Sequence, residues 1–239
     1  MRDGLPWAIG ASLAALLLLV PVVAVLALGV IAFDVPLFTF ITAEDSVLEW
    51  PQFFALLVAA ALFVAIARQS RAAGLRWWVV GGLFAALLAC FVAGEEISWG
   101  QRILGLATPA GLAAINHQDE LTIHNIGTVQ TLFGYAEMLV GLVGCLLPIG
   151  AWAWARAGRR PLLPALLVPP LALVTVFALP AGYRLVRILF LPDTQFRIVK
   201  FGELPELSLY LGVAIMAGLI YRRMRSDPGA AILAAQPGG

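Results

Sequence analysis

Six long apolar runs are the feature of this sequence that most limits how it can fold. Each is close to the length of about 20 residues that an α-helix needs to cross the hydrocarbon core of a bilayer. The runs cover residues 7–33, 50–67, 77–93, 131–155, 162–190 and 207–221. They leave no stretch between them that could form a soluble domain. We therefore expect an all-α, polytopic integral membrane protein built as a bundle of about six transmembrane helices.

The composition agrees with a chain that lies mostly in a membrane. Only 12% of the residues are charged, whereas a soluble domain carries about 25%. The first apolar run is about twice as long as the hydrophobic region of a signal peptide, so we interpret it as a retained span. The fifth run is expected to be kinked or broken by its prolines, which are Pro164, Pro169, Pro170 and Pro180. We expect one transmembrane domain over 1–228 and a disordered tail over 229–239.

The charged residues separate into two groups, and this separation predicts the orientation. The segments 1–3, 68–76, 156–160 and 222–227 together hold ten arginines and two acids, whereas the opposite side holds five basic and twelve acidic residues. Segments rich in arginine stay in the cytoplasm. Both termini are therefore predicted to be cytoplasmic. The single lysine among 15 basic residues suggests a GC-rich bacterial source, which would place the acidic side in the periplasm, outside the inner (plasma) membrane.

Four glutamates lie at one predicted depth near the outer face. Glu49, Glu95, Glu137 and Glu203 are each 19 residues from a cytoplasmic arginine of the same run. At 1.5 Å per residue, each carboxylate lies roughly 28 Å from the inner boundary, near the outer edge of the core. We expect a shared polar layer there. Two alternatives stay open: the acids face water, or they form a structural layer of salt bridges with the outer arginines and Lys200.

The segment 93–105, "AGEEISWGQRILG", places two adjacent carboxylates and an arginine where the third apolar run ends. If the helix continues through it, one face carries Glu95, Ser98 and Arg102 and another carries Glu96, Trp99 and Ile103. One glutamate could then face a polar cavity together with Arg102.

Both histidines of the protein lie in the outer segment 108–128, "TPAGLAAINHQDELTIHNIGT". His117, Glu120 and His124 are spaced i, i+3, i+7, so they project from one face if the segment is helical. A short helix is expected in this loop between the third and fourth spans. The spacing suits a divalent metal such as zinc or iron, with a fourth ligand from Glu95, Glu96 or Glu203. Metal-free acid–base chemistry and simple docking of the loop are the alternatives.

The segment 183–207, "YRLVRILFLPDTQFRIVKFGELPEL", mixes basic and large apolar residues. It predicts a re-entrant or interfacial helix at the outer leaflet. Arg184 and Arg187 could hold a lipid phosphate there, and Tyr183 reaches the same level. Arginines that only anchor a helix by extending to the interface give the same pattern.

The gathering of acids and histidines at one membrane face resembles the layout of intramembrane metallohydrolases of the alkaline ceramidase type. The sequence lacks their full set of histidines, so no residue assignment follows from this resemblance.

Our leading hypothesis is a membrane hydrolase or transferase that acts on a lipid or a lipid-linked substrate. The residues assigned to it are Glu95, Glu96 and Glu203 for catalysis, His117, Glu120 and His124 for a metal, and Arg102, Tyr183, Arg184 and Arg187 for the substrate. A metal-activated water would supply the nucleophile. The expected partners are membrane lipids and no nucleic acid. A proton- or cation-coupled carrier and a non-catalytic subunit of a membrane assembly are the alternatives.

Overall fold

The computed structural model describes residues 4–43, 47–116, 119–159, 166–191 and 196–226, with side chains described from Leu17 onward. In these parts every regular element is a helix, and the one β contact is an isolated bridge between Asn116 and Ile126. The predicted all-α class is therefore confirmed. The predicted tail 229–239 lies outside the described residues.

The longer helices match most of the predicted runs. They are α1 (Gly4–Ile31), α3 (Glu49–Ala72), α4 (Arg76–Glu96), α7 (Gly127–Arg156), α8 (Val174–Phe190) and α10 (Glu203–Ser226). The short helices are α2 (Val35–Thr42), α5 (Gln101–Leu104), α6 (Ala110–Ala113) and α9 (Phe196–Lys200), with 3-10 turns η1 (Ser98–Gly100) and η2 (Leu171–Leu173).

Five helices of the described part are long and apolar enough to cross a membrane. They are Glu49–Ala72, Arg76–Glu96, Gly127–Arg156, Leu171–Phe190 and Phe196–Ser226. These helices indicate a multi-pass membrane protein. Helix α1 is 28 residues long, and its apolar part with described side chains is the shorter Leu17–Ile31. A sixth span and the sidedness of the termini therefore stay predictions.

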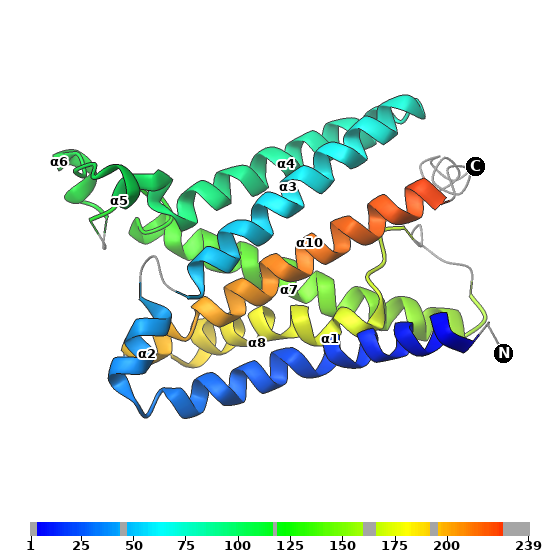
Figure 1. The fold of residues 1–239 in the computed structure, drawn as a ribbon, viewed down its shortest axis with the longest axis horizontal. Helices are drawn as coiled ribbons and strands as arrows, with labels where there is room; N and C mark the ends of the chain where they lie inside the picture. Colours follow the sequence, from blue (N-terminus) through cyan, green and yellow to red (C-terminus); the bar gives the residue numbers. More distant parts are fainter. Residues whose placement is uncertain (1–3, 44–46, 117–118, 160–165, 192–195, 227–239) are drawn as a thin grey trace.

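Two groups of helices form the bundle. Helices α3 and α4 lie antiparallel beside each other, α7 and α1 pack on α8, and α10 lies between the groups in contact with α3 and α8 (Figure 1). Helix α1 begins and α10 ends at one end of the bundle, whereas α2, α5 and α6 lie at the opposite end (Figure 1). We call this opposite end, which also carries the end of α4, the loop end.

Small residues allow the paired helices to approach closely. A Cβ added to Gly82 of α4 would lie 3.1 Å from the Cβ of Ala67 on α3. A Cβ on Gly141 of α7 would lie 2.9 Å from the carbonyl oxygen of Phe177 on α8. Close backbone contact of this kind is a main source of helix association in membranes. The pairs α3–α4 and α7–α8 therefore form tightly packed supports for the side chains at the loop end.

Of the two predictions about the fifth run and the segment after it, the first is confirmed and the second is corrected. Pro169 and Pro170 precede η2, and the helix begins only at Leu171, so the run is broken at its start, as expected for proline. The basic segment after it is not one interfacial helix. Arg184 and Arg187 lie within α8, and only the five residues of α9 stand apart, directly before Phe201 and α10.

Candidate functional site

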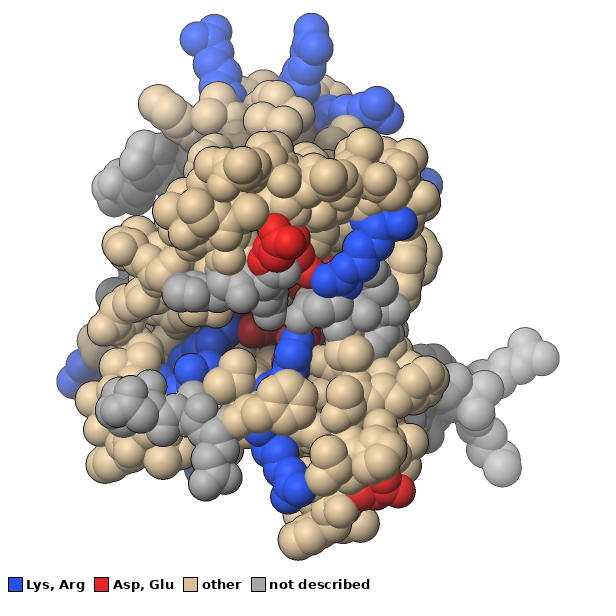
Figure 2. Space-filling view, turned by 90° about the vertical axis from the view of Figure 1, so that its left-hand side faces the viewer, with Lys and Arg blue, Asp and Glu red and all other residues tan. Residues whose placement is uncertain are grey.

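A polar cavity of about 380 Å³ opens at the loop end, between α4, α7, α8, α9 and α10. In the view of that end, acidic and basic side chains meet near its centre (Figure 2). The charged and histidine residues that line the cavity are Glu95, Glu96, Glu120, Glu137, Glu203, Glu206, Arg184, Arg187, Lys200 and His124. Three of the four glutamates predicted at one depth therefore line the same cavity. The fourth, Glu49, is buried at the start of α3 and is not part of the lining.

The chain turns sharply where α4 ends, so the expected helix through 93–105 is wrong. Helix α4 ends at Glu96, and Ser98, Trp99 and Gly100 follow with φ values of 47°, 54° and 75°. Three successive left-handed residues end the helix, because a right-handed helix requires negative φ. Arg102 is thereby carried away from the face of Glu95.

The turn folds Trp99 back over the last turns of α4. Its ring lies on Gly94, where an added Cβ would come within 2.8 Å of the ring atoms. Its indole Nε1 donates a hydrogen bond of 2.7 Å to Oε1 of Glu95. Trp99 therefore bonds Glu95, whereas the predicted continuous helix placed it on the same face as Glu96.

The second oxygen of Glu95 holds the loop that carries His124. Oε2 accepts hydrogen bonds from the backbone N–H groups of Ile123 (2.8 Å) and His124 (2.9 Å). It also lies 3.2 Å from Nδ1 of the His124 ring. Glu95 is only 2% exposed, so the carboxylate is satisfied by protein donors. We call Glu95 and His124 the dyad.

The environment of His124 makes its imidazole a stronger base. Partial burial alone would lower the pKa of the imidazole, but the hydrogen bond with Glu95 and the negative charges of Glu206, Glu95 and Glu120 outweigh it and raise the pKa. The ring is 28% exposed and lines the cavity. The group can therefore exchange protons with whatever the cavity contains.

The loop directly before His124 is not helical: the short helix of the outer segment is α6 (Ala110–Ala113), earlier in the sequence. Asp119 has a φ of 56°, and residues 119–126 form bends and turns. The side-chain amide of Asn116 closes the loop by donating to the carbonyl oxygens of Thr122 (2.7 Å) and Glu120 (3.1 Å). The predicted single helical face for the metal residues is therefore wrong for Glu120 and His124, and His117 lies outside the described residues.

Glu120 binds protein groups on both oxygens. It pairs with Arg102 through Oε1 and accepts a hydrogen bond of 3.0 Å from Asn125 Nδ2 through Oε2. Arg102 thus fastens the loop to the segment after the turn and is not among the residues that line the cavity. Gln101 supports the same contact, because its Oε1 accepts a 2.6 Å hydrogen bond from the backbone N–H of Leu121.

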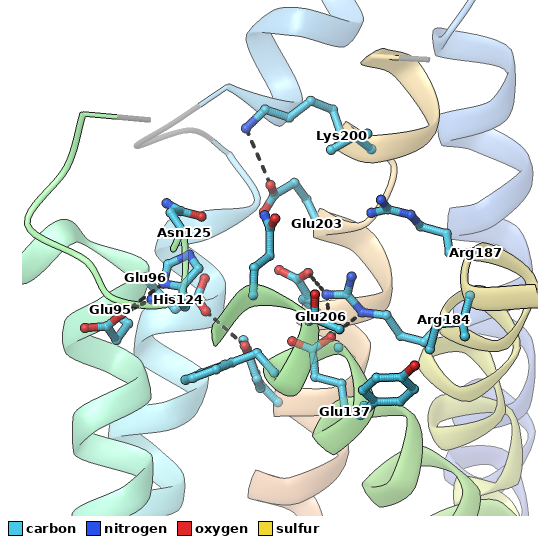
Figure 3. A pocket seen from close by; sticks show the side chains of 18 of the residues that line it. Glu95, Glu96, His124, Asn125, Glu137, Arg184, Arg187, Lys200, Glu203 and Glu206 are labelled. Atoms are coloured by element: carbon cyan, nitrogen blue, oxygen red, sulfur yellow. Dashed lines mark hydrogen bonds and ion pairs between the residues drawn. The ribbon is translucent and has the colours of Figure 1, made fainter. Parts of the chain in front are cut away.

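A second charged group joins three long helices. Arg184 of α8 donates a hydrogen bond from Nε to Glu137 of α7. Its Nη2 lies 2.5 Å from Oε1 of Glu206 on α10 (Figure 3). The side chain of Arg184 is only 15% exposed. We call these three residues the Arg184 cluster. Tyr183, predicted at the site, instead donates its hydroxyl hydrogen to the carbonyl oxygen of Ile198, 2.8 Å away, and lies outside the lining.

Glu96 faces the cavity from α4, on the side opposite Arg184 and Arg187 (Figure 3). Its Oε1 accepts a hydrogen bond of 2.9 Å from the hydroxyl of Tyr210 on α10. Sequence reasoning did not identify Tyr210, and it counted Glu206 among the outer acids without assigning it to the site. The spacing gives a signal for both, because Tyr210 follows Glu206 by four residues and so shares its helical face.

The metal prediction stays open. Within the described ranges, no group of three His, Cys, Asp or Glu side chains is placed to hold a metal ion. His117, one of the predicted ligands, lies outside those ranges, so the full predicted set is not tested.

Comparison of the chain with protein-family models, with curated proteins and with solved structures gives no match. The class of protein therefore follows from the structure alone: a helical protein with several apolar helices, as expected of a membrane protein.

Proposed function

We propose that this protein is a membrane-embedded hydrolase or transferase whose active site is the cavity at the loop end. The observation that carries the proposal is the dyad. A buried carboxylate holds Nδ1 of a partly exposed histidine that lines a cavity of about 380 Å³. A carboxylate that orients an imidazole in this way is the usual arrangement of a general base.

In this proposal, His124 accepts a proton through Nε2 from a water molecule or a substrate hydroxyl. Glu95 keeps the ring in place and stabilises the imidazolium that forms. Glu96 is the second acid–base group, because it faces the same cavity and bonds the hydroxyl of Tyr210. Glu203 lines the cavity, and its Oε1 lies 3.7 Å from Nζ of Lys200. The proposed role of Glu203 is to position the substrate.

The proposed substrate is a lipid or a lipid-linked molecule. Apolar side chains of Phe133, Ile188 and Leu191 line the cavity beside the charged ones. Leu189 and Phe190, next to them on α8, are 60% and 71% exposed, as is expected for side chains that face acyl chains. An amphiphile could therefore place its head group in the cavity and its chains along α8.

Arg187 is the proposed contact for an anionic part of that head group. It lines the cavity from α8. Arg184, which the sequence also suggested for this role, already binds two carboxylates. We place the reaction at the periplasmic face of a bacterial inner membrane, as the distribution of arginines predicts.

A divalent metal ion, zinc or iron, is a second way for the cavity to activate water. His124 and a cavity glutamate would supply ligands, with His117 as the further ligand predicted from the sequence. Replacement of His117 separates the two mechanisms, since only the metal site requires it.

A cation-coupled carrier is the second candidate function, favoured by the six glutamates in the lining against three Arg and Lys residues. A carrier also needs a polar route to the other face. In the described core toward the termini, side chains such as Leu173, Ala217 and Met224 are apolar and buried, so the enzyme is the better supported function.

The proposal is tested with His124→Gln and Glu96→Gln, which keep approximate volume and hydrogen-bonding capacity. Membrane lipids of cells that produce the parent protein or a variant are compared by mass spectrometry, together with the amount and melting temperature of each purified protein. We expect the parent to change at least one lipid species. Both variants should fold normally, yet lower that conversion by ~100-fold or more.

His117→Gln is the matched control for the mechanism. It should retain conversion if His124 acts as a base, and lose it together with bound metal if the site holds an ion. Identical lipid profiles with and without the parent protein would contradict the enzyme. Uptake of protons or cations by vesicles, lost in Glu96→Gln, would then support the carrier.

A further inference from the structure

The backbone after α4 is left-handed at two consecutive non-glycine residues. Among the described residues, the non-glycine residues with positive φ are Ser98, Trp99 and Asp119. Ser98 and Trp99 are consecutive and directly follow the helix that carries Glu95 and Glu96. A left-handed conformation is unfavourable for a large side chain, and it persists only where surrounding contacts fix it.

Burial of the indole is a poor reason for this strain. Trp99 is 48% exposed, although the edge of its ring meets Phe91 with centroids 5.7 Å apart. The well-defined contact of Trp99 is polar, the 2.7 Å hydrogen bond from Nε1 to Oε1 of Glu95. Gly94 allows this contact, because a Cβ at that position would meet the ring.

The two oxygens of Glu95 have different hydrogen-bond partners. Oε1 accepts from Trp99, and Oε2 accepts from the backbone of Ile123 and His124 and faces Nδ1 of His124. With a donor on each side, the carboxylate cannot rotate without losing a hydrogen bond. Its Oε2 is an acceptor, so a neutral His124 that bonds it must carry its proton on Nδ1.

We propose that Trp99 is a positioning residue that holds Glu95 in the orientation that fixes His124 as the Nδ1–H tautomer. The unprotonated nitrogen is then Nε2, the one that the proposed function uses as a base. The inference rests on the proposed function for its purpose, but its geometry and its test do not require any catalytic activity.

The indole N–H donates to Glu95 and not to the other groups around His124. Glu120 on the loop and Glu206 on α10 supply negative charge, and Phe133 of α7 lies with its ring centre 6.0 Å from the imidazole. A change in the tautomer of a Trp99 variant can therefore be assigned to Glu95, the group that Trp99 contacts.

The test uses the full chain in detergent micelles with ¹⁵N-labelled histidine. His117→Gln is present in every sample, so that His124 gives the only imidazole signals. The samples are kept at a pH above the raised pKa of His124, so that its ring is neutral. The ¹⁵N shifts then distinguish the two tautomers, and they are compared for the Trp99 parent, Trp99→Phe and Phe91→Leu. Phe91→Leu disturbs the packing of the indole and keeps its N–H.

We expect one dominant Nδ1–H tautomer in the parent and in Phe91→Leu, and a mixture of tautomers in Trp99→Phe. A parent that is mainly Nε2–H, or a Trp99→Phe variant with the parent's tautomer, would overturn the inference and leave Trp99 as an interfacial anchor. If Trp99→Phe does not fold, Gly94→Ala, which displaces the same ring, replaces it. Failure of the enzyme proposal is distinguishable: the tautomer would change as expected, but lipid conversion would not depend on His124.

Discussion

The dyad and the Arg184 cluster contribute to the same cavity but are built differently. The Arg184 cluster joins α7, α8 and α10 within the bundle, and its arginine bonds a carboxylate on each of two neighbouring helices. The dyad forms where α4 ends, and Glu95 there receives donors from a strained turn and from a loop. The first group connects three helices to one another, and the second connects the end of one helix to a turn and a loop.

The difference lies in what each positive partner can do. Arginine stays protonated at any physiological pH and offers a fixed set of donors, so Arg184 gives a permanent connection between helices. His124 changes its charge near neutrality and is partly exposed to the cavity. We infer that the first group serves mainly stability and the second mainly chemistry, although both use glutamates predicted at one depth.

The largest effect is expected from breaking the Arg184 cluster. Arg184→Gln leaves Glu137 and Glu206 without their shared cation at a largely buried position. Removing one partner of a buried ion pair costs about 3–5 kcal/mol, a large part of the stability of a domain. We expect a strong fall in the amount of folded protein in membranes and in its melting temperature, measured in the same detergent as the parent.

Replacing all three members tests the reason for that loss. A variant with Glu137→Met, Arg184→Met and Glu206→Met removes the charges together, and we expect it to recover most of the stability, because apolar residues of similar volume can replace a buried ionic group. An Arg184→Gln protein that melts like the parent would show that the cluster is not a structural connection.

The sequence predicted the parts of the site that depend on depth along a straight helix. Glu95, Glu137 and Glu203 line one cavity, and the sequence placed them at one level from the rise per residue and the arginines predicted to be cytoplasmic. This argument needs no tertiary contact. The depth of a residue does not show which side of its helix faces the cavity. Glu49, predicted at the same depth, is buried and does not line the cavity.

The sequence failed where the chain leaves regular structure. The motif 93–105 was interpreted as a continuous helix, since Ser98 and Trp99 carry no signal of the left-handed turn that they form. Because of that turn, Trp99 bonds Glu95 and does not lie on the face of Glu96. Arg102 pairs with Glu120 for the same reason. Contacts such as Glu95 with the backbone of Ile123 depend on loop closure over 28 positions of the sequence, which no local pattern encodes.

A matched pair of glycine substitutions is expected to have smaller and opposite consequences in the two regions. In Gly144→Ala, the new methyl group would overlap the ring of Phe177 between α7 and α8. Overpacking of this kind costs about 1–3 kcal/mol, so the melting temperature should fall while His124 keeps its tautomer. In Gly94→Ala, the methyl group would meet the half-exposed Trp99, which can move outward.

We therefore expect Gly94→Ala to melt closer to the parent than Gly144→Ala does, and to lose the fixed tautomer of His124. Thermal unfolding and the ¹⁵N shifts of the histidine are measured on the same samples. If Gly94→Ala were the less stable of the two, or if it kept the tautomer, the distinction between a packed region and a positioning region would be lost.

The smallest effect is expected from pH, and it concerns the dyad alone. Folding raises the pKa of His124, because the hydrogen bond with Glu95 and the nearby carboxylates outweigh partial burial. The folded state then binds the proton more tightly than the unfolded state, whose histidine titrates near 6.5. The stabilisation is complete below about pH 6.5 and is lost as the pH rises through the higher folded value, and for a partly exposed pair it should stay below about 1 kcal/mol.

The measurement is the difference in melting temperature between the parent and His124→Gln, followed from acidic to alkaline pH. Taking the difference removes the contribution of every group that the two proteins share, and His117→Gln serves as the second histidine control. We expect the advantage of the parent to be greatest at the acidic end and to shrink as the pH rises. A difference that is constant, or that grows with pH, would mean that His124 does not pair with Glu95 as a cation. The dyad would then resemble the Arg184 cluster in being insensitive to the proton, and it would lose its claim to acid–base chemistry.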